Sequence, residues 1–429
     1  MAKCSKRKSA RNAVRRERPG KNIPVGMTLV LVLAGTCSTL RAADDRPDHN
    51  YQNRLPSTKS VNIDKQITDV THVEVYKTAK GPKWNSWTRC WFTPEGYLRV
   101  SFLDITGGQP GMKPDYGYEY ASAEVLAKQG IKRCSRWCES QDAGRTWKPI
   151  RQIDASDPLK PRPDFFLLLR DRSLLGIGGV WCAWDPEKKD YIRIGHTMAW
   201  RSSDGGATWS RPVSLNDPNR MLSFCCLPKQ LRDGTIVQPA YGTFDRNKPS
   251  PNTDAWLRFS PDGGKSWSEP LVLARGTDTL TNDEPEVVEL KNGDLLVVLR
   301  HANPKAKSPA LYLNCGQIIV TKAASGWKPG PLKQTNMGFR GFPALLRTRD
   351  GVLICAGSGN QFNFSFDEGR TWTATRSIAD PKYNRHNHYP TLVELADGRI
   401  LSVYHLGNHW PYPPPDDQWI HATSFRLKR

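Results

Sequence analysis

One short pattern, Ser-x-Asp-x-Gly-x-Thr/Ser-Trp, constrains the fold of this chain more than any other feature, because it recurs. Its four intact copies are Ser140–Trp147, Ser202–Trp209, Ser260–Trp267 and Ser365–Trp372. The residue types suit a tight turn: Asp accepts hydrogen bonds from backbone N–H groups, Gly adopts a positive φ, and Trp packs against a neighbouring element. A shortened copy, Ala324–Trp327, stands where a further repeat is expected. The pattern therefore predicts an array of similar structural units, and we assign these residues to the fold and not to catalysis.

Hairpin signals precede these turns and recur through the same part of the chain. Asp-Gly-type loops between apolar runs lie at Glu95-Gly96, Asp233-Gly234, Asn292-Gly293, Asp350-Gly351 and Asp397-Gly398. Asp171–Ser173 fills a sixth place with a variant turn. Six hairpins at such spacing predict an all-β fold, a six-bladed β-propeller and not a sandwich.

The N-terminus resembles an export signal. Nine basic residues precede the apolar run Met27–Gly35, and the small residues Ala42 and Ala43 follow it. The run is too short to span a bilayer as a stable helix. We therefore expect a signal peptide and basic leader over residues 1–43, a lead-in segment over 44–75 and the propeller over 76–429. The mature protein is expected to be exported, secreted or periplasmic, with no stable membrane span.

The remaining charge does not point to nucleic acid. The formal net charge is +20, and residues 1–43 carry +9 of it. The remaining +11 could favour acidic ligands, but solvated surface Lys and Arg explain it equally well. Eight of the ten Cys follow the leader, and the sequence leaves their pairing open. His386 and His388 share one strand face without a ligand-like partner, so no metal is expected.

The residues at the propeller axis can be counted from the turns, because a propeller gathers the start of each innermost strand there. Nine residues before each turn glycine, or before Ser173 in the variant turn, stand Trp87, Asp164, Cys225, Glu284, Phe342 and Tyr389. In the fourth repeat, Glu284 begins one strand of a hairpin and Arg300 ends the other, so both lie near the same edge of the sheet. The axis is thus the place where chemistry is expected.

The recurring pattern is similar to the Asp box of the sialidase (neuraminidase) superfamily, whose fold is a six-bladed BNR-repeat propeller. The resemblance covers about Tyr76 to Leu427, and Ile420–Phe425 is expected to close the ring. It implies a retaining exo-sialidase that acts on sialylated or other acidic glycans without a cofactor. Tyr389 would be the nucleophile and Glu284 the base that takes its proton.

The resemblance also implies the other site residues. Arg300 and Arg340 would bind the carboxylate of the substrate, because guanidinium groups are planar, permanently charged and bidentate. The acid/base Asp would come from the loop before the first Asp box, which offers Asp115 and Asp104. Asp164 is a rival for that role because of its position at the axis.

One departure from the family pattern leaves alternatives open. The family has an Arg-Ile-Pro sequence ten residues before the first turn glycine, where this chain has Ser86. Arg89 lies three residues later and would point elsewhere unless the strand is bulged. The alternatives are a propeller that binds acidic glycans without cleaving them, and a propeller glycosidase with another sugar specificity. The sequence leaves the oligomeric state open.

Overall fold

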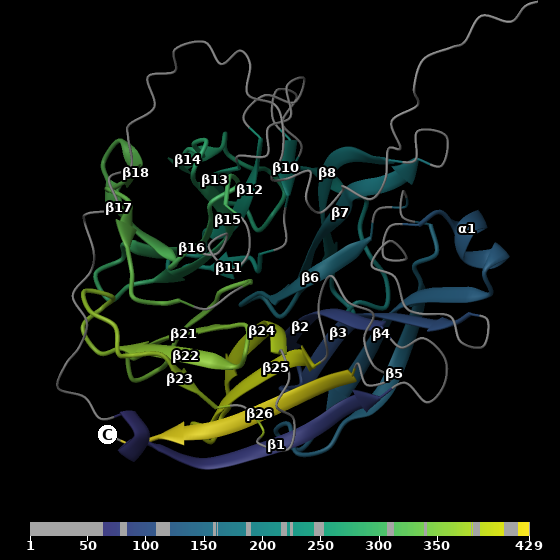
Figure 1. Ribbon diagram of the computed structural model, residues 1–429, viewed down its shortest axis with the longest axis horizontal. Helices are drawn as coiled ribbons and strands as arrows, with labels where there is room; N and C mark the ends of the chain where they lie inside the picture. Colours follow the sequence, from purple (N-terminus) through teal and green to yellow (C-terminus); the bar gives the residue numbers. More distant parts are fainter. Residues whose placement is uncertain are drawn as a thin grey trace, which may run out of the picture.

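The structure is a computed structural model that describes part of the chain. The described residues are 63–77, 84–108, 121–157, 160, 162–185, 190–215, 221–223, 226–243, 253–306, 313–338, 341–378, 380, 387–406 and 419–428. Within these ranges six antiparallel sheets stand around a central axis (Figure 1), which confirms the predicted all-β, six-bladed propeller. No helix among the described residues is long and apolar enough to cross a membrane.

Each of the first five blades is built from consecutive strands. Blade 1 contains β2 (Trp84–Phe92), β3 (Leu98–Gly107), β4 (Ile131–Ser140) and β5 (Lys148–Asp154), with helix α1 (Ala123–Lys128) before β4. Blade 2 contains β6 (Pro163–Leu168), β7 (Leu174–Asp185), β8 (Asp190–Ser202) and β9 (Val213–Ser214). Blade 3 contains β10 (Met221–Ser223), β11 (Lys229–Gln230), β12 (Ile236–Thr243), β13 (Asp254–Ser260) and β14 (Leu271–Ala274).

The last three blades follow the same plan with one exception. Blade 4 contains β15 (Thr281–Glu289), β16 (Leu295–Ala302), β17 (Gly316–Ala323), β18 (Gly326–Pro329) and β19 (Lys333–Gln334). Blade 5 contains β20 (Ala344–Arg347), β21 (Leu353–Gly357), β22 (Gln361–Ser365) and β23 (Arg376–Ser377). Blade 6 contains β24 (Asn387–Glu394), β25 (Ile400–Leu406), β26 (Trp419–Leu427) and, from the other end of the chain, β1 (Ile67–Lys77) after the short 3-10 helix Ile63–Lys65.

The ring is closed by strands from both ends of the propeller. β1 pairs antiparallel with β26, from Ile67 opposite Leu427 to Lys77 opposite Trp419, and the two strands lie side by side in Figure 1. The predicted closing strand, Ile420–Phe425, lies within β26. The expected propeller boundary at residue 76 falls inside β1, which begins at Ile67.

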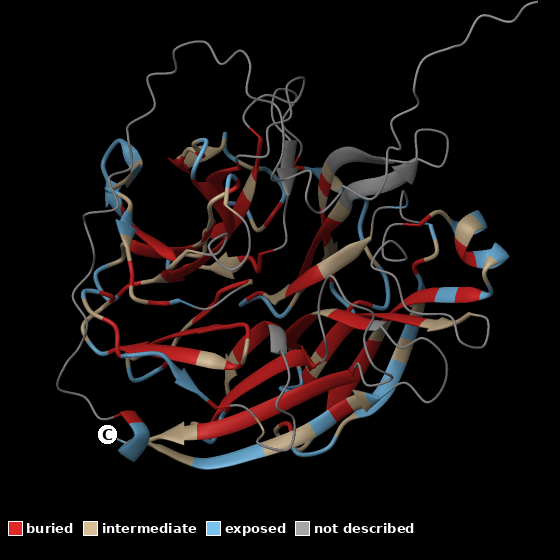
Figure 2. Cartoon of the chain, viewed as in Figure 1, coloured by how far each residue is buried: buried red, intermediate tan, exposed pale blue. Residues whose placement is uncertain are grey.

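Apolar side chains fill the spaces between blades. Val237 and Leu257 of blade 3, for example, pack with Val297 and Ile318 of blade 4 in one buried cluster. Figure 2 shows the resulting pattern: the inner strands are buried, whereas much of β1 on the outside is exposed. Burial of both faces explains why the strands read as continuous apolar runs.

The four intact Asp boxes form the same turn between the last two strands of their blades. In blade 5, Asp367 accepts hydrogen bonds from the backbone N–H of Thr371 (2.9 Å), its hydroxyl (2.6 Å) and the hydroxyl of Ser365 (2.8 Å). The Ser365 hydroxyl in turn accepts from Gly369 N–H at 2.9 Å. The boxes at Asp142, Asp204 and Asp262 repeat these contacts.

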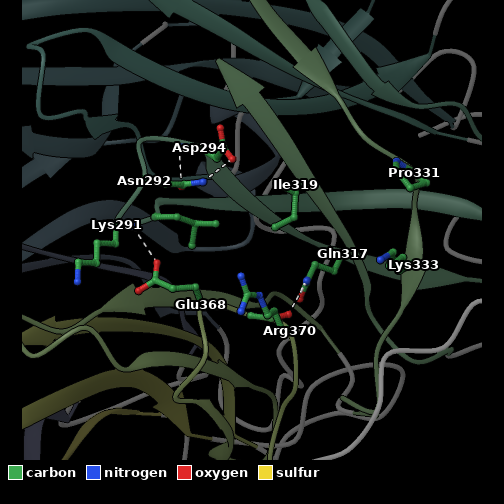
Figure 3. A pocket seen from close by; sticks show the side chains of 11 residues that line it. Lys291, Asn292, Asp294, Gln317, Ile319, Pro331, Lys333, Glu368 and Arg370 are labelled. Atoms are coloured by element: carbon green, nitrogen blue, oxygen red, sulfur yellow. Dashed lines mark hydrogen bonds between the residues drawn. The ribbon is translucent and has the colours of Figure 1, made fainter. Parts of the chain in front are cut away.

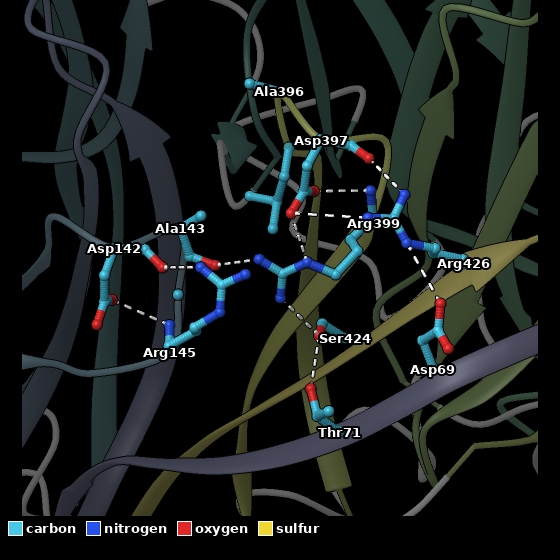
Figure 4. Close-up of polar contacts among 12 residues, drawn as sticks. Asp69, Thr71, Asp142, Ala143, Arg145, Ala396, Asp397, Arg399, Ser424 and Arg426 are labelled. Atoms are coloured by element: carbon cyan, nitrogen blue, oxygen red, sulfur yellow. Dashed lines mark hydrogen bonds and ion pairs between the residues drawn. The ribbon is translucent and has the colours of Figure 1, made fainter.

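Hydrogen bonds from the preceding blade hold each intact box. Arg399 in blade 6 donates to the carbonyl of Ala143 in the blade 1 box at 3.0 Å (Figure 4). The boxes of blades 2, 3 and 5 receive the corresponding bonds from Arg99, Arg201 and Gln317. Part of the excess of basic residues is therefore used between blades, where guanidinium groups cap backbone carbonyls.

The propeller thus has two different faces. We call the edge that carries the hairpin turns and the Asp boxes the turn face, and the opposite edge, where the innermost strands begin, the site face. The strand registers separate them, because Glu289 pairs with Leu295 beside the turn whereas Asp283 pairs with Arg300 at the other end. On the turn face a groove of about 710 Å³ lies between blades 4 and 5, lined by Lys291, Glu368 and Arg370 among others (Figure 3).

Candidate active site

Irregular backbone marks the start of three innermost strands on the site face. The pairing register shifts between Ser86 and Arg89 in β2, between Asp283 and Glu286 in β15, and between His388 and Thr391 in β24. At these bulges Trp87, Glu284 and Tyr389 have φ angles of 62°, 45° and 52°. Residues with side chains rarely adopt such angles, and bulges of this kind redirect side chains.

Tyr389 and Glu284 meet at this place. The phenol of Tyr389 donates a hydrogen bond to Oε1 of Glu284 at 3.2 Å, although the two residues are 105 positions apart. The contact expected from their shared register is therefore present. Only 7% of Tyr389 is exposed, so a phenol proton can pass to the carboxylate without crossing bulk water.

Three rings fix the orientation of Tyr389. The ring centroids of Trp87, Phe342 and His405 lie 4.5, 5.7 and 5.6 Å from that of Tyr389. Trp87 and Phe342 stand at the same register in blades 1 and 5, and His405 lies on β25 of the same blade. The aromatic side chains that begin the innermost strands of blades 1 and 5 therefore hold Tyr389 in place by packing against its ring.

Glu284 is held between the phenol and a guanidinium. Nε of Arg300 lies 2.9 Å from its Oε2. Burial has the largest effect on the pKa of Glu284 and raises it; Asp283 adds to the rise, and Arg300 and Tyr389 oppose it. A carboxylate with a raised pKa accepts a proton more readily, which suits a general base.

Arg300 serves two carboxylates at once. Besides Glu284, it reaches Oδ2 of Asp283 through Nη2 at 3.3 Å. Asp283 also accepts hydrogen bonds from the hydroxyls of Thr281 (2.9 Å) and Thr253. These carboxylates raise the pKa of Arg300, against the effect of burial. Arg300 therefore lies in the site as expected, with two of its nitrogens already facing acidic groups.

The bulge in β2 also decides the position of Arg89. Its guanidinium carbon lies 4.2 Å from the ring centroid of Phe165 and 5.4 Å from that of Phe342, and 3% of the residue is exposed. Its Nη1 donates to the carbonyl of Thr88 at 2.6 Å. The bulge brings Arg89 to the axis, where it is buried between these rings and its charge opposes the raised pKa of Glu284.

Asp164 begins the innermost strand of blade 2. Its Oδ1 lies 3.3 Å from Nε of Arg162, and 35% of its side chain is exposed. Partial burial raises the pKa of Asp164, and the positive charges of Arg162 and Arg89 oppose the rise. Asp164 is therefore a partly accessible carboxyl in the same electrostatic cluster as Arg89.

The two aspartates expected from the loop have different outcomes. Asp104 is fully buried on β3, where it accepts hydrogen bonds from Asn85 (2.8 Å), Arg136 (2.6 Å) and Tyr76 (3.1 Å). Because Tyr76 lies on β1 of blade 6, these three partners give Asp104 a structural role between blades 1 and 6. Asp115 lies outside the described residues, and so does Arg340.

A second register count would have found further residues of the site. Seven positions after a turn glycine stand Tyr241, Arg300, Ser358 and His405. His405 pairs with His388 just as Arg300 pairs with Asp283, so both hold the same place in their blades. Tyr241 lies close enough to Arg300 to contribute to its raised pKa. The count at the axis used the innermost strands of all blades but the second strand of the fourth repeat alone, so it does not reach His405 and Tyr241.

Metal and disulfide chemistry find no support in the described part of the chain. It holds no group of three or more His, Cys, Asp or Glu residues placed to bind a metal ion. Six cysteines whose side chains are described are buried free thiols, namely Cys90, Cys134, Cys138, Cys226, Cys315 and Cys355. Burial raises the pKa of Cys90 to about 12. Such thiols are poor nucleophiles. Cys225 and His386 lie outside the described residues.

Comparisons with known proteins agree with the fold. The family described as "BNR repeat-like domain" matches residues 182–314. A sialidase of Micromonospora viridifaciens is 23% identical over 311 residues, covering 66% of this chain and 46% of its own. A sialidase of Bacteroides fragilis is 24% identical over 233 residues, covering 49% and 41%. The chain spans less than half the length of these curated relatives.

Solved structures share the architecture at low sequence identity. The GH93 alpha-L-arabinofuranosidase of Fusarium graminearum superimposes with a TM-score of 0.56 and 15% identity, covering 83% of this chain and 97% of that one. The NanB sialidase of Streptococcus pneumoniae gives a TM-score of 0.53 and 10% identity, covering 83% and 70%. At such identities these likenesses show the fold alone.

Proposed function

Because this chain is a six-bladed BNR-repeat propeller of the sialidase superfamily, we propose that it is a retaining glycoside hydrolase that removes terminal sialic or related acidic sugars from glycans. The hydrogen bond between Tyr389 and Glu284 carries this proposal, because it joins a nucleophile and a base at the axis. A nucleophile within hydrogen-bond reach of a general base is the signature of covalent catalysis.

In this mechanism Tyr389 attacks the anomeric carbon. Its Oη forms a bond to that carbon as the glycosidic C–O bond breaks, and the phenol proton passes to Glu284. An acid protonates the departing oxygen, and water then releases the sugar from Tyr389. The anomeric carbon of a sialic acid bears a carboxylate, which would repel a carboxylate nucleophile but not a neutral phenol.

Arg300 would bind the carboxylate of the substrate through its partly exposed face, with Arg340 as the second expected ligand. In this structure Nε and Nη2 of Arg300 face Glu284 and Asp283. A substrate carboxylate would therefore join an existing charge cluster. A guanidinium suits this task because its five donors can serve several acceptors together.

One observation favours a second candidate, a propeller glycosidase for a sugar without an anomeric carboxylate. Two nitrogens of Arg300 are already paired with carboxylates, Arg89 is buried, and Ser86 stands where the family has its first Arg. A solved structure with the same fold is an arabinofuranosidase. In this case Glu284 itself would be the attacking carboxylate, as in the two-carboxylate scheme of most glycosidases.

A substrate panel separates these candidates. We would incubate the purified chain with 4-methylumbelliferyl α-sialoside, α-L-arabinofuranoside and β-glucuronide, and measure released fluorophore. Turnover of the sialoside alone is the expected result. Turnover of the arabinofuranoside alone would replace the first candidate by the second. Binding of sialyllactose in calorimetry without turnover of any substrate would instead indicate a non-catalytic glycan-binding propeller.

A further inference from the structure

The proposed reaction needs an acid for the departing oxygen, and the axis offers three ionisable side chains at one register. Asp164 of β6, Glu284 of β15 and Tyr389 of β24 each begin an innermost strand next to a register shift. These positions converge because the innermost strands of a propeller surround its axis. Tyr389 and Glu284 are hydrogen-bonded to each other. Asp164 therefore remains available for a separate role.

Accessibility distinguishes the two carboxylates. Asp164 has 35% of its side chain exposed, against 4% for Glu284. An acid that protonates a leaving group must reach the side of the sugar that faces the mouth of the site. A base that serves Tyr389 must instead stay beneath the sugar, beside the phenol. The geometry therefore suits Asp164 to the first task and Glu284 to the second.

The electrostatic surroundings of Asp164 fit an acid that must also work as a base. Partial burial raises the pKa of Asp164 and so favours the protonated form. Arg162, at 3.3 Å, and Arg89 favour the ionised form that is left after the proton has been donated. Asp164 can therefore change its protonation state within one catalytic cycle.

We propose that Asp164 is the general acid/base of the glycoside hydrolysis described above, on which this inference rests. In the first step its carboxyl proton goes to the glycosidic oxygen as the bond from that oxygen to the anomeric carbon breaks, and Tyr389 Oη bonds to the carbon. In the second step the Asp164 carboxylate takes a proton from water. The oxygen of that water bonds to the anomeric carbon, Tyr389 Oη leaves, and the proton held by Glu284 returns to the phenol.

The variant Asp164→Asn tests the proposal through the leaving group. Sialyllactose releases a sugar alcohol that needs protonation, whereas 4-nitrophenyl sialoside releases a stable phenolate that does not. We expect kcat/KM for sialyllactose to fall about 100-fold or more, in the range of general acid catalysis. For the 4-nitrophenyl substrate we expect a fall of less than about tenfold, because protonation matters less there. Equal losses on both substrates would overturn the proposal.

Asp115→Asn is the matched control, because Asp115 is the rival for the same role. If it shows the leaving-group dependence and Asp164→Asn does not, Asp164 is not the acid. Asp164→Glu serves as the second variant if the amide impairs folding, since it keeps an acid and should retain more activity on sialyllactose than Asp164→Asn. No such difference between the two would also contradict the role.

Different results would reject the proposed glycosidase function and the proposed role of Asp164. A wild-type chain that cleaves none of the panel substrates would remove both proposals together. If Asp164→Asn shows the leaving-group dependence but Tyr389→Phe has unchanged turnover, Asp164 stands and only the tyrosine mechanism fails. Added azide gives one more readout: it should speed the second step in Asp164→Asn, because azide attacks without a general base, and should leave the wild type unchanged.

Discussion

The two faces of this propeller are built by opposite rules. On the turn face the same residues recur from blade to blade, and Asp142, Asp204, Asp262 and Asp367 make the same hydrogen bonds. On the site face one register holds Trp87, Asp164, Glu284, Phe342 and Tyr389. Repetition therefore builds the scaffold, and the candidate catalytic residues lie where the repeat is broken.

The backbone shows the same contrast. On the turn face most positive φ angles fall on glycine, as at Gly234 (93°) and Gly293 (92°), and the turn residues Ala143, Arg172 and Glu368 adopt them as well. On the site face they fall on Glu284 (45°) and Tyr389 (52°). A side chain in that region costs of the order of 1–3 kcal/mol and persists only where the surrounding structure holds it. Glu284 and Tyr389 therefore keep these backbone angles only because the packing around the axis holds them.

The largest expected effect is on catalysis, at the site face. We expect Tyr389→Phe to lower kcat at least about a thousandfold, as removal of a nucleophile does in other enzymes. The ring keeps its neighbours Trp87, Phe342 and His405, so the melting temperature should change little. Kinetics on 4-methylumbelliferyl sialoside and a thermal melt measure the two quantities.

Tyr404→Phe is the matched control for this prediction. Tyr404 is also buried in blade 6, but its phenol bonds to the hydroxyl of Thr423 at 2.8 Å, away from Glu284. Its loss should cost about 1 kcal/mol of stability and leave kcat unchanged. Similar kinetic losses in both variants would show that Tyr389 acts through packing alone.

The next effect is on stability, where the ring closes. Arg399 bonds to Asp397 (2.8 Å), Ser424 (3.2 Å) and Ala143 (3.0 Å), and 10% of its side chain is exposed. We expect Arg399→Ala to lower the free energy of unfolding by about 2 kcal/mol, because buried partners lose charged hydrogen bonds. Arg349 makes similar contacts to the next blade but is 59% exposed, so Arg349→Ala should cost less than about 1 kcal/mol.

Urea denaturation of both arginine variants measures this difference. Equal losses would mean that burial does not decide the strength of these contacts between blades. Neither variant should change KM or kcat, since both residues lie on the turn face.

The sequence predicted features that depend on short-range patterns. Hairpin loops and boxes are local, so six blades could be counted, and one register brought Tyr389 and Glu284 together over 105 positions. Two features had no local signal. The pairing of β1 with β26 joins the two ends of the propeller, and the bulge that buries Arg89 against Phe165 depends on packing between blades. Long-range contacts of this kind do not show in periodicity.

A smaller effect is expected within a single box on the turn face. Asp367 accepts two hydrogen bonds from Thr371 and one from Ser365. Asp367→Ala should lower the free energy of unfolding by about 1–2 kcal/mol, because the backbone N–H of the turn loses its partner. Glu269→Ala, a substitution of an exposed residue beyond another box, should have almost no effect. A change in kcat or KM of Asp367→Ala would contradict the expectation that residues of the turn face affect stability alone.

The smallest effect is the response of the boxes to acid. Hydrogen bonds from Thr146 and Ser140 outweigh the effect of burial and lower the pKa of Asp142 from 3.8 to about 2. A folded-state pKa below that of the unfolded chain stabilises the fold above pH 3.8, and this stability is lost as the pH falls toward 2. Urea denaturation between pH 6 and pH 2.5 should therefore show a decline at the acid end. Asp142→Asn removes one titrating group, so its decline should be shallower, whereas Glu269→Gln should follow the wild type. Identical slopes in the wild type and Asp142→Asn would mean that the boxes hold the blades together without depending on the charge of their aspartates.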